Sequence, residues 1–350
     1  MKIIQWATGA MGKTCLRAVI DRPDFELVGL FVYGSAKAGQ DAGVIARRPE
    51  TGVIATRDIE EILALDADVV IHAARLDPPF ERHDGDILRL LRSGKNVISI
   101  NGGSFPPFWG EARREAFEAA CAEGRSSFMG AGLNPGFGLE KLAVLASGVC
   151  SDVTRVSLRE TVDCRAVKSA EYVFDIIGFG AEPGSVDPNH ADWVPGQTMN
   201  ALFREVVACA GHRLGWTLDG VETAHTLVAA GTDLEIAAGT IRKGGAARLD
   251  WRWLGKVAGE TRVDLGISWT METPPADAAH QPLWSIRVEG TPTVNLAFDL
   301  ETPEGWTART TAEQLGVAGA VLNAIPAVIA APPGLQVAPL ATHYKAPATA

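Results

Sequence analysis

Lys2-Ile3-Ile4-Gln5-Trp6-Ala7-Thr8-Gly9-Ala10-Met11-Gly12 opens the chain and decides the fold. An apolar run leads into a glycine turn, then a helix-length segment over 10–20 and a second apolar run over 27–33. This order is typical of a βαβ unit, which binds a pyrophosphate group at the N-terminus of its helix. We therefore predict that the chain begins with a dinucleotide-binding domain.

The turn is a variant of the G-x-G-x-x-G fingerprint. Ala7 stands in the first glycine position, and Gly9 and Gly12 stand in the second and third. Gly9 would let the backbone approach the phosphates, and Gly12 would let the helix lie close to the strand. A glycine-rich turn that binds nothing is the alternative. The predicted cofactor contacts in this turn are Ala7, Thr8, Gly9, Ala10, Met11 and Gly12.

The segment after the second apolar run bears on the choice of cofactor. A site specific for NAD usually carries an acidic residue there, which binds the adenosine ribose hydroxyls. This chain has Ser35 and Lys37 instead, a donor and a positive charge that suit a 2′-phosphate. NADP(H) is therefore favoured, and NAD(H) is possible. Alternatively, Lys37 is a solvated loop lysine.

Further cofactor contacts are expected where later parallel strands end, because ligands bind at the carboxyl edge of such sheets. The apolar run 67–74 ends in His72, Ala73 and Ala74. We favour the two alanines as contacts and interpret His72 as a satisfied structural residue. The strand over 96–100 leads to Asn101 and Gly102, and the loop over 131–138 adds Asn134.

Composition limits the classes of function. The 350 residues include 42 acidic and 32 basic residues, a net charge of −10 that argues against a nucleic-acid partner. The sequence shows neither a leader pattern nor an apolar run long enough to span a membrane, so we expect a cytoplasmic protein. The five cysteines are widely spaced, and no metal site is predicted.

From about residue 151 the pattern changes to alternating segments, which are typical of an antiparallel sheet with one buried face. In the first, Val156, Leu158, Val162 and Cys164 share a face with Glu160. Glu160 is therefore a carboxylate on an apolar face, which suits an acid catalyst, although a buried salt bridge is an equal alternative. A sheet with this much apolar face needs a cover beyond the two helices found in the sequence, which predicts a homodimer.

Two helical segments, 170–180 and 196–214, carry aromatic and aliphatic residues. The candidate lining of a pocket for a small apolar substrate is Phe137, Tyr172, Phe174 and Met199, with Ile177, Phe179, Trp193 and Phe203 beside them, although such residues are often simple core. A last helix begins with the capping-box order of Thr310 and Glu313. The expected fold is α/β, with a Rossmann doubly wound parallel sheet in residues 1–135 and 310–350. An α+β domain with a mostly antiparallel sheet follows in 136–309.

Four motifs together carry a family resemblance: Ala7 to Gly12, Asp66 to Val70, Gly132 to Phe137, and Glu313 to Pro326. The chain resembles the 2,4-diaminopentanoate dehydrogenase and native amine dehydrogenase family, whose N-terminal domain is similar to that of dihydrodipicolinate reductase. The resemblance implies NAD(P)H-dependent reductive amination, or its reverse, in a homodimer whose sheets pack together. Asn323, within the last motif, joins the cofactor contacts.

The chain departs from its relatives at two places. The catalytic Glu of the amine dehydrogenases is missing, since Asn101, Gly102, Gly103 and Ser104 occupy that segment. Residues 160–168 lack the histidines of dihydrodipicolinate reductase, so we reject that activity. The favoured function is an NAD(P)H-dependent reductase of a C=N or C=O bond, with Glu160 as its acid. The alternatives are a hydroxyl-compound dehydrogenase or carbonyl reductase, and a non-catalytic NADP(H)-binding redox sensor.

Overall fold

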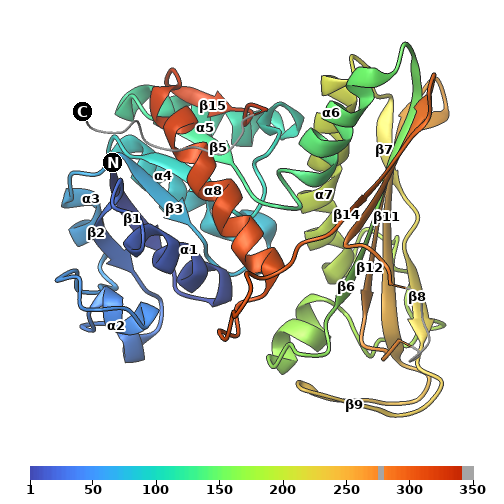
Figure 1. Ribbon diagram of the computed structural model, residues 1–350, viewed down its shortest axis with the longest axis horizontal. Coiled ribbons are helices and arrows are strands. Elements are labelled where there is room, and N and C mark those ends of the chain that lie inside the picture. The colour runs from blue at the N-terminus through green and yellow to red at the C-terminus, as the bar shows by residue number, and fades with distance from the viewer. Residues whose placement is uncertain (275–279, 341–350) are drawn as a thin grey trace. The chain divides into compact units, whose positions relative to one another are not determined.

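The computed structural model describes residues 1–274 and 280–340, and it divides into two compact units (Figure 1). Unit 1 combines Met1–Leu76, Glu81–Phe137 and the chain from Leu300 onward. Unit 2 combines Asp77–Phe80 with Gly138–Asp299. The chain therefore leaves unit 1 after Phe137 and returns to it at Leu300.

Unit 1 contains a six-stranded sheet in the order β15-β5-β4-β3-β1-β2, with all neighbours parallel. The strands are β1 (Lys2–Trp6), β2 (Glu26–Phe31), β3 (Val69–His72), β4 (Asn96–Ser99), β5 (Ser127–Gly130) and β15 (Gly334–Gln336). Every residue of β3 is buried, as a strand covered on both faces requires. This sheet confirms the predicted Rossmann-type fold.

Helices cover both faces of this sheet. They are α1 (Ala10–Ile20), α2 (Ala42–Ala46), α3 (Ile59–Ala64), α4 (Asp84–Arg92), α5 (Glu111–Gly124) and α8 (Ala312–Ala330), with 3₁₀ turns η1 (Ser35–Lys37), η2 (Phe80–His83) and η3 (Pro106–Phe108). Successive strand residues point to opposite faces. Accordingly, Ile3 packs in a cluster with α1 and α8, whereas Ile4 packs in one with α4 and α5.

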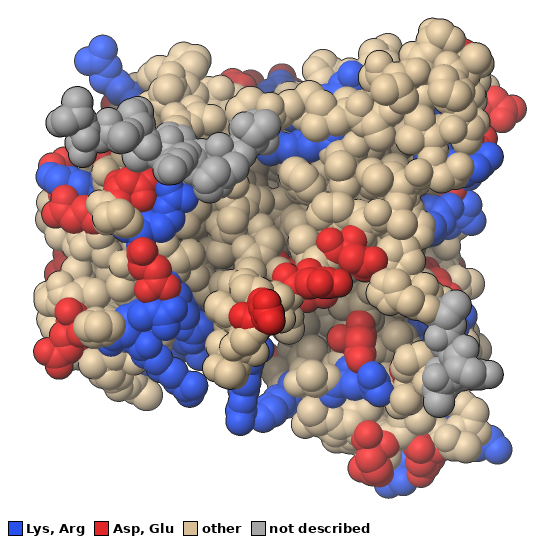
Figure 2. All heavy atoms as spheres, in the orientation of Figure 1, with Lys and Arg blue, Asp and Glu red and all other residues tan. Residues whose placement is uncertain are grey.

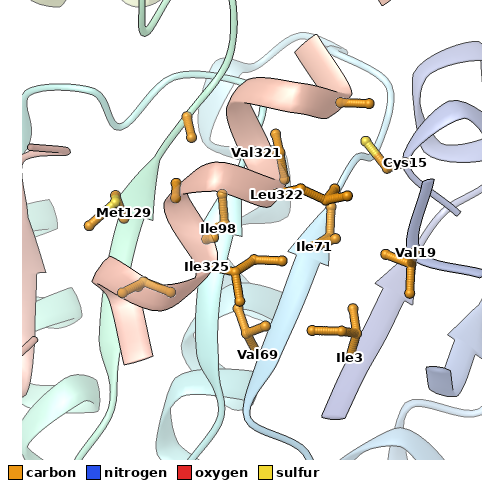
Figure 3. Close-up of a cluster of buried hydrophobic side chains, with 14 of the residues drawn as sticks. Ile3, Cys15, Val19, Val69, Ile71, Ile98, Met129, Val321, Leu322 and Ile325 are labelled. Atoms are coloured by element: carbon orange, nitrogen blue, oxygen red, sulfur yellow. The ribbon is translucent and has the colours of Figure 1, made fainter. Parts of the chain in front are cut away.

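Helix α8 fills the core on one face of the sheet. Figure 3 shows its side chains Val321, Leu322 and Ile325 directed at residues of the strands, among them Val69 and Ile71. By length and composition α8 is apolar enough to cross a membrane. Its place in this cluster gives its apolar side chains a packing role.

The C-terminal segment differs from the sequence prediction at two points. The capping box is formed by Thr311 and Gln314, one residue later than predicted, because the Thr310 side chain accepts a hydrogen bond from Arg17 instead. After α8 the chain also adds β15 to the sheet, parallel to β5. A strand of three residues leaves almost no periodic signal in a sequence.

Unit 2 contains a seven-stranded sheet in the order β14-β13-β6-β12-β11-β7, with β8 also paired to β11. These strands are β6 (Val153–Asp163), β7 (Gly220–Thr223), β8 (Thr226–Ala229), β11 (Ala246–Val257), β12 (Glu260–Thr270), β13 (Trp284–Gly290) and β14 (Val294–Phe298); β9 (Leu234–Ile236) and β10 (Gly239–Ile241) form a separate hairpin. Only the β6–β12 pair is parallel among the described pairs. The mostly antiparallel sheet was predicted.

One face of this sheet is apolar and largely buried. Val156 and Leu158 of β6 lie in rows with apolar residues of β12 and β13. The helices of unit 2 are α7 (Val194–Arg213), α6 (Val144–Ala146), η5 (Ser147–Val149) and the π-helical segments η4 (Gly138–Ala143) and η6 (Glu171–Ile176). Both α7 and η4 pack on the sheet and cover much of this face. Val162, Trp269 and Phe298 keep some exposure on it, so the further cover stays a prediction. The sequence analysis did not anticipate η4.

The opposite face of the sheet is polar. Its centre is Asp264, whose side chain is fully covered by Arg155, Arg159 and Arg252. Burial by itself would raise the pKa of Asp264, but hydrogen bonds from the arginines outweigh it and hold this pKa well below its usual range. The carboxylate therefore stays ionised and ties β12 to β6 and β11.

Candidate active site

The glycine turn after β1 has the shape that the fingerprint requires. Ala7 has φ +70°, a left-handed conformation that costs roughly 1–2 kcal/mol for a residue other than glycine. A Cβ atom at Gly12 would lie 2.2 Å from the Ala7 carbonyl oxygen, so only glycine fits there. Both positions thus fix the approach of α1 to the strand.

Gly9 is different, because no atom of the described residues requires a glycine there. It is the N-cap of α1, it is exposed, and a Cβ atom on it would meet nothing within 4 Å. The first turn of α1 contains no acidic residue, and its N–H groups are of the kind that bind anions. Open space at Gly9 in front of this helix end fits a dinucleotide pyrophosphate group.

Lys37 reaches back to this turn. Its ammonium group donates to the Thr8 carbonyl oxygen at 2.8 Å and to Thr8 Oγ1 at 2.9 Å. Burial, with a smaller effect from the charge of Lys13, lowers the pKa of Lys37 below its ordinary value. Lys37 is therefore anchored, and the interpretation as a solvated loop lysine is wrong. Ser35 lies exposed at the start of η1.

The structure also joins the ends of β3 and β4. The Asn101 side-chain amide donates to the Ala74 carbonyl oxygen at 2.6 Å, and the Ala73 N–H donates to the Trp6 carbonyl oxygen at 3.0 Å. Gly102 has φ +88° and is buried beside Gly130 of β5. Three of these predicted contacts, Ala73, Ala74 and Asn101, therefore line one edge of the sheet with the glycine turn.

His72 is not the satisfied structural residue that we expected. It is 1% exposed, and neither ring nitrogen has a hydrogen-bond partner among the described residues. Burial lowers the pKa of His72 to about 3, and the charge of His83 acts in the same direction. The ring is thus neutral and keeps an unused donor and an unused acceptor at the carboxyl end of β3.

In unit 2, Glu160 lies on the apolar face of the sheet, as the alternation predicted. It is half-buried in β6, opposite Trp284 of β13 and Ile267 of β12. Val162, two residues further along the same face, pairs with Trp269. Glu160 is therefore one row of side chains away from that pair.

Val162 and Trp269 belong to an apolar cavity of about 170 Å³. Its lining consists of Val162, Cys164, Val167, Tyr172, Val173, Ile177, Phe179, Trp269 and Met271. Of the predicted pocket residues, Tyr172, Ile177 and Phe179 are in this lining. Phe174 instead packs near Gly180 and Gly239, and Met199 is fully buried in α7. The cavity carries no charged side chain.

Comparison with known proteins places the two parts of the chain in known families. Residues 2–77 match the family model described as dihydrodipicolinate reductase, N-terminus. Residues 137–342, more than half of the chain, match that of the 2,4-diaminopentanoate dehydrogenase C-terminal domain. The chain belongs to the 2,4-diaminopentanoate dehydrogenase family.

Individual relatives agree with this family. An amine dehydrogenase of Streptomyces virginiae is 29% identical, over 95% of this chain and 93% of its own length. The 2,4-diaminopentanoate dehydrogenase of Acetoanaerobium sticklandii is 23% identical, over 96% and 92%. The structure of an amine dehydrogenase from Mycobacterium smegmatis shares the fold, with a TM-score of 0.77 at 18% identity over 99% of this chain and 97% of that one. The protein is an NAD(P)-dependent oxidoreductase.

The other residues predicted for the cofactor site and the substrate pocket lie in the tight loop after β5 and in α8. The loop is compact, since a Cβ atom at Gly136 would lie 2.6 Å from the Gly132 nitrogen. Asn134 and Phe137 are half-buried within it, and Asn323 is half-buried in α8. The structure does not bring Phe137 into the lining of the apolar cavity.

Besides Asp264, two buried carboxylates of unit 2 were not predicted from the sequence. Glu140 in η4 is 1% exposed and Glu205 in α7 is fully buried. Burial lowers the pKa of Lys141, and the charge of Glu140 opposes this effect. Burial also raises the pKa of Cys209 to about 12, and there the charge of Glu140 acts in the same direction. The sequence did contain one signal for a buried carboxylate, namely Glu140 within the apolar stretch that follows Gly138. Among the described residues, no group of His, Cys, Asp and Glu forms a metal site.

Proposed function

We propose that this enzyme reduces the C=N bond formed when a small apolar ketone or aldehyde condenses with ammonia. The supporting observation is the apolar cavity beside Glu160. At about 170 Å³ the cavity is smaller than the roughly 300–1,000 Å³ of usual ligand sites, so it suits a short hydrocarbon chain. Without a charged group in its lining, it offers nothing to a substrate carboxylate.

Glu160 supplies the charge that this chemistry needs. Ammonium must lose a proton before its nitrogen can attack a carbonyl carbon, and the iminium that forms after loss of water carries a positive charge. A carboxylate on an apolar face can accept the proton and hold the cation, because the low local dielectric strengthens both interactions. The reduced nicotinamide, when bound, supplies the hydride. Glu160 would thus replace the family Glu missing at 101–104.

A turnover screen tests this function against its alternatives. We expect NADPH consumption with short ketones or aldehydes only when ammonium is present. Equal consumption without ammonium would indicate a carbonyl reductase or, in reverse, a hydroxyl-compound dehydrogenase. Cofactor binding without any turnover would indicate a redox sensor. Amine formation measured in the same reactions distinguishes reductive amination from slow carbonyl reduction.

We also propose that NADP(H) is preferred over NAD(H). Lys37 has three N–H donors and Thr8 accepts two of them, so the third is available to a phosphate group. Ser35 is exposed two residues away. The segment from 32 to 37 carries no acidic side chain for the ribose hydroxyls. A charge-assisted contact to a 2′-phosphate fits this set of residues.

Replacing Lys37 separates its two roles. Lys37→Ala removes the Thr8 contact for either cofactor, but it removes a phosphate contact only for NADPH. We expect the affinity for NADPH to fall by about 1–2 kcal/mol more than the affinity for NADH. Calorimetric titration of both cofactors measures this difference. An equal loss for both would mean that Lys37 only orders the turn.

We propose a homodimer that associates through the polar face of the unit 2 sheet. The three arginines around Asp264 leave that centre with a net positive charge, and Asp163, Asp250 and Glu272 line a neighbouring pocket on the same face. Charges of both signs on one face suit pairing with a second copy. Light scattering at micromolar concentration should give twice the chain mass of 37.0 kDa, and a mass of 37.0 kDa would contradict this proposal.

We place the enzyme in the cytoplasm and propose no nucleic-acid or membrane partner. All five cysteines are free thiols, as is usual in a reducing compartment. Figure 2 shows positive and negative side chains interspersed on the visible face, and the net charge is −10. These features favour a small-molecule substrate over a polyanion.

A further inference from the structure

Five aromatic and histidine side chains gather where β1, β2 and β3 end. This edge cluster consists of Trp6, Phe31, Tyr33, His72 and His83. The Trp6 ring stacks on Phe31, with centroids 3.8 Å apart and planes at 12°. Tyr33 meets Phe31 edge-on at 5.2 Å, and His72 lies 5.9 Å from Trp6 on a near-parallel plane. The cluster thus forms a continuous aromatic layer.

Tyr33 is the exposed member of the edge cluster, at 44% of its surface. Its hydroxyl accepts a hydrogen bond from Trp6 Nε1 at 2.9 Å and lies 3.3 Å from His83 Nδ1. His83 Nε2 lies 3.0 Å from the Arg75 carbonyl oxygen, which can only accept. His83 therefore carries its proton on Nε2, and the Tyr33 hydroxyl donates to Nδ1. An exposed ring fixed in this way loses little freedom when a flat ligand stacks on it.

His72 lies beside Trp6 and His83 as the buried polar member of the edge cluster. Its imidazole and that of His83 are 5.5 Å apart. The unused donor and acceptor of His72 are buried, and burying such groups without partners is costly. A small polar guest at the edge cluster, such as a water molecule or an atom of a ligand, would satisfy them. A cluster with one exposed ring for stacking and imidazole groups nearby suits a heteroaromatic base.

The location indicates which base this is. The Ala7 N–H donates to the Phe31 carbonyl oxygen at 2.9 Å, so the end of β2 lies directly beside the glycine turn. The chain then passes Tyr33 and returns to the turn through Lys37 and Thr8. In doubly wound sheets the adenosine half of a dinucleotide extends from the turn towards the end of the second strand. Tyr33 is on that path.

We propose that Tyr33 is the surface on which the adenine ring of the cofactor stacks, with His72 and His83 as the polar groups that support it. The proposal rests on dinucleotide binding by unit 1 but not on the choice between NADP(H) and NAD(H). It makes Tyr33 a specificity residue for the adenosine half, with no part in the reduction itself.

The test compares Tyr33→Leu with Tyr33→Phe by calorimetric titration. The probes are ADP and 2′,5′-ADP, which contain only the adenosine half. Stacking on an aromatic side chain is worth enough that Tyr33→Leu should weaken both probes about tenfold or more. Tyr33→Phe loses the same hydroxyl contacts but keeps the ring, so its affinities should stay within about threefold of the parent. Thermal unfolding verifies that both variants are folded.

Parent-like affinity in Tyr33→Leu, or an equal loss in Tyr33→Phe, would overturn the proposal, since the ring face would then not matter. An effect on 2′,5′-ADP without one on ADP would also overturn it and would point to the 2′-phosphate instead. If only the NADP(H) proposal were wrong, ADP and 2′,5′-ADP would bind the parent equally. Tyr33→Leu would still weaken the binding of both probes.

His72→Leu examines the buried polar group separately. Removing an unsatisfied imidazole should leave the unfolding midpoint unchanged or raise it. If His72 supports the base, the affinity for ADP should nevertheless fall at least threefold. A more stable variant with unchanged affinity for ADP would remove His72 from the proposed site.

Discussion

Glu160→Gln should reduce turnover by about 10²–10⁴-fold while the affinity for the cofactor stays unchanged. The substitution preserves the size of the side chain beside Ile267 and Trp284 but removes its negative charge and its ability to take up a proton. Initial rates with saturating ketone and ammonium measure the first effect. Calorimetric titration of NADPH measures the second.

Glu260→Gln is the matched control, because Glu260 is an exposed carboxylate at the start of the neighbouring strand β12. Its turnover should equal that of the parent. A Glu160→Gln enzyme that keeps the parent rate would show that Glu160 is structural. The buried Glu140 and Glu205 would then be the next carboxylates to test. A loss of both turnover and thermal stability in Glu160→Gln would point to a packing role.

The two glycines of the turn should respond differently to the same added methyl group. In Gly9→Ala the new Cβ meets no atom of the chain, so the unfolding midpoint should stay within a few degrees of the parent. The methyl group would occupy the space that fits the pyrophosphate, so the dissociation constant for NADPH should rise at least tenfold.

Gly12→Ala should instead destabilise the fold by about 1–3 kcal/mol or more, because its Cβ would lie 2.2 Å from the Ala7 carbonyl oxygen. Thermal unfolding and NADPH titration of both variants provide the comparison. Parent-like binding by Gly9→Ala would mean that the phosphates do not approach this turn.

Much of unit 1 could be predicted because its signals are local. The order of apolar run, glycine turn and helix lies within thirty residues, and each later strand is a short apolar run that ends in small or polar residues. The alternation in β6 likewise placed Glu160 on the correct face. In both cases the spacing of side chains along one element decides their direction.

The rest depends on contacts between residues distant in sequence. No local pattern shows that Lys37 reaches Thr8, that Asn101 bonds the carbonyl group of Ala74, or that His72 lacks partners. The contribution of η4 to the cover of the unit 2 sheet was not predicted, because η4 is a π-helix, whose spacing differs from the period used to find α-helices. The cavity beside Glu160 is formed by several elements, and of its lining residues only Tyr172, Ile177 and Phe179 were predicted as pocket residues.

The position of β15 affects the order in which the protein is assembled during synthesis. The sheet that contains the first strand of the chain is completed by β15, and one of its cores requires α8. The ribosome therefore delivers the continuous stretch Gly138–Asp299 before the sheet of unit 1 can close. Domains usually fold in the order of synthesis. Here the cofactor domain stays incomplete, with apolar strand surface exposed, until unit 2 has been synthesised, and such a state is prone to aggregation.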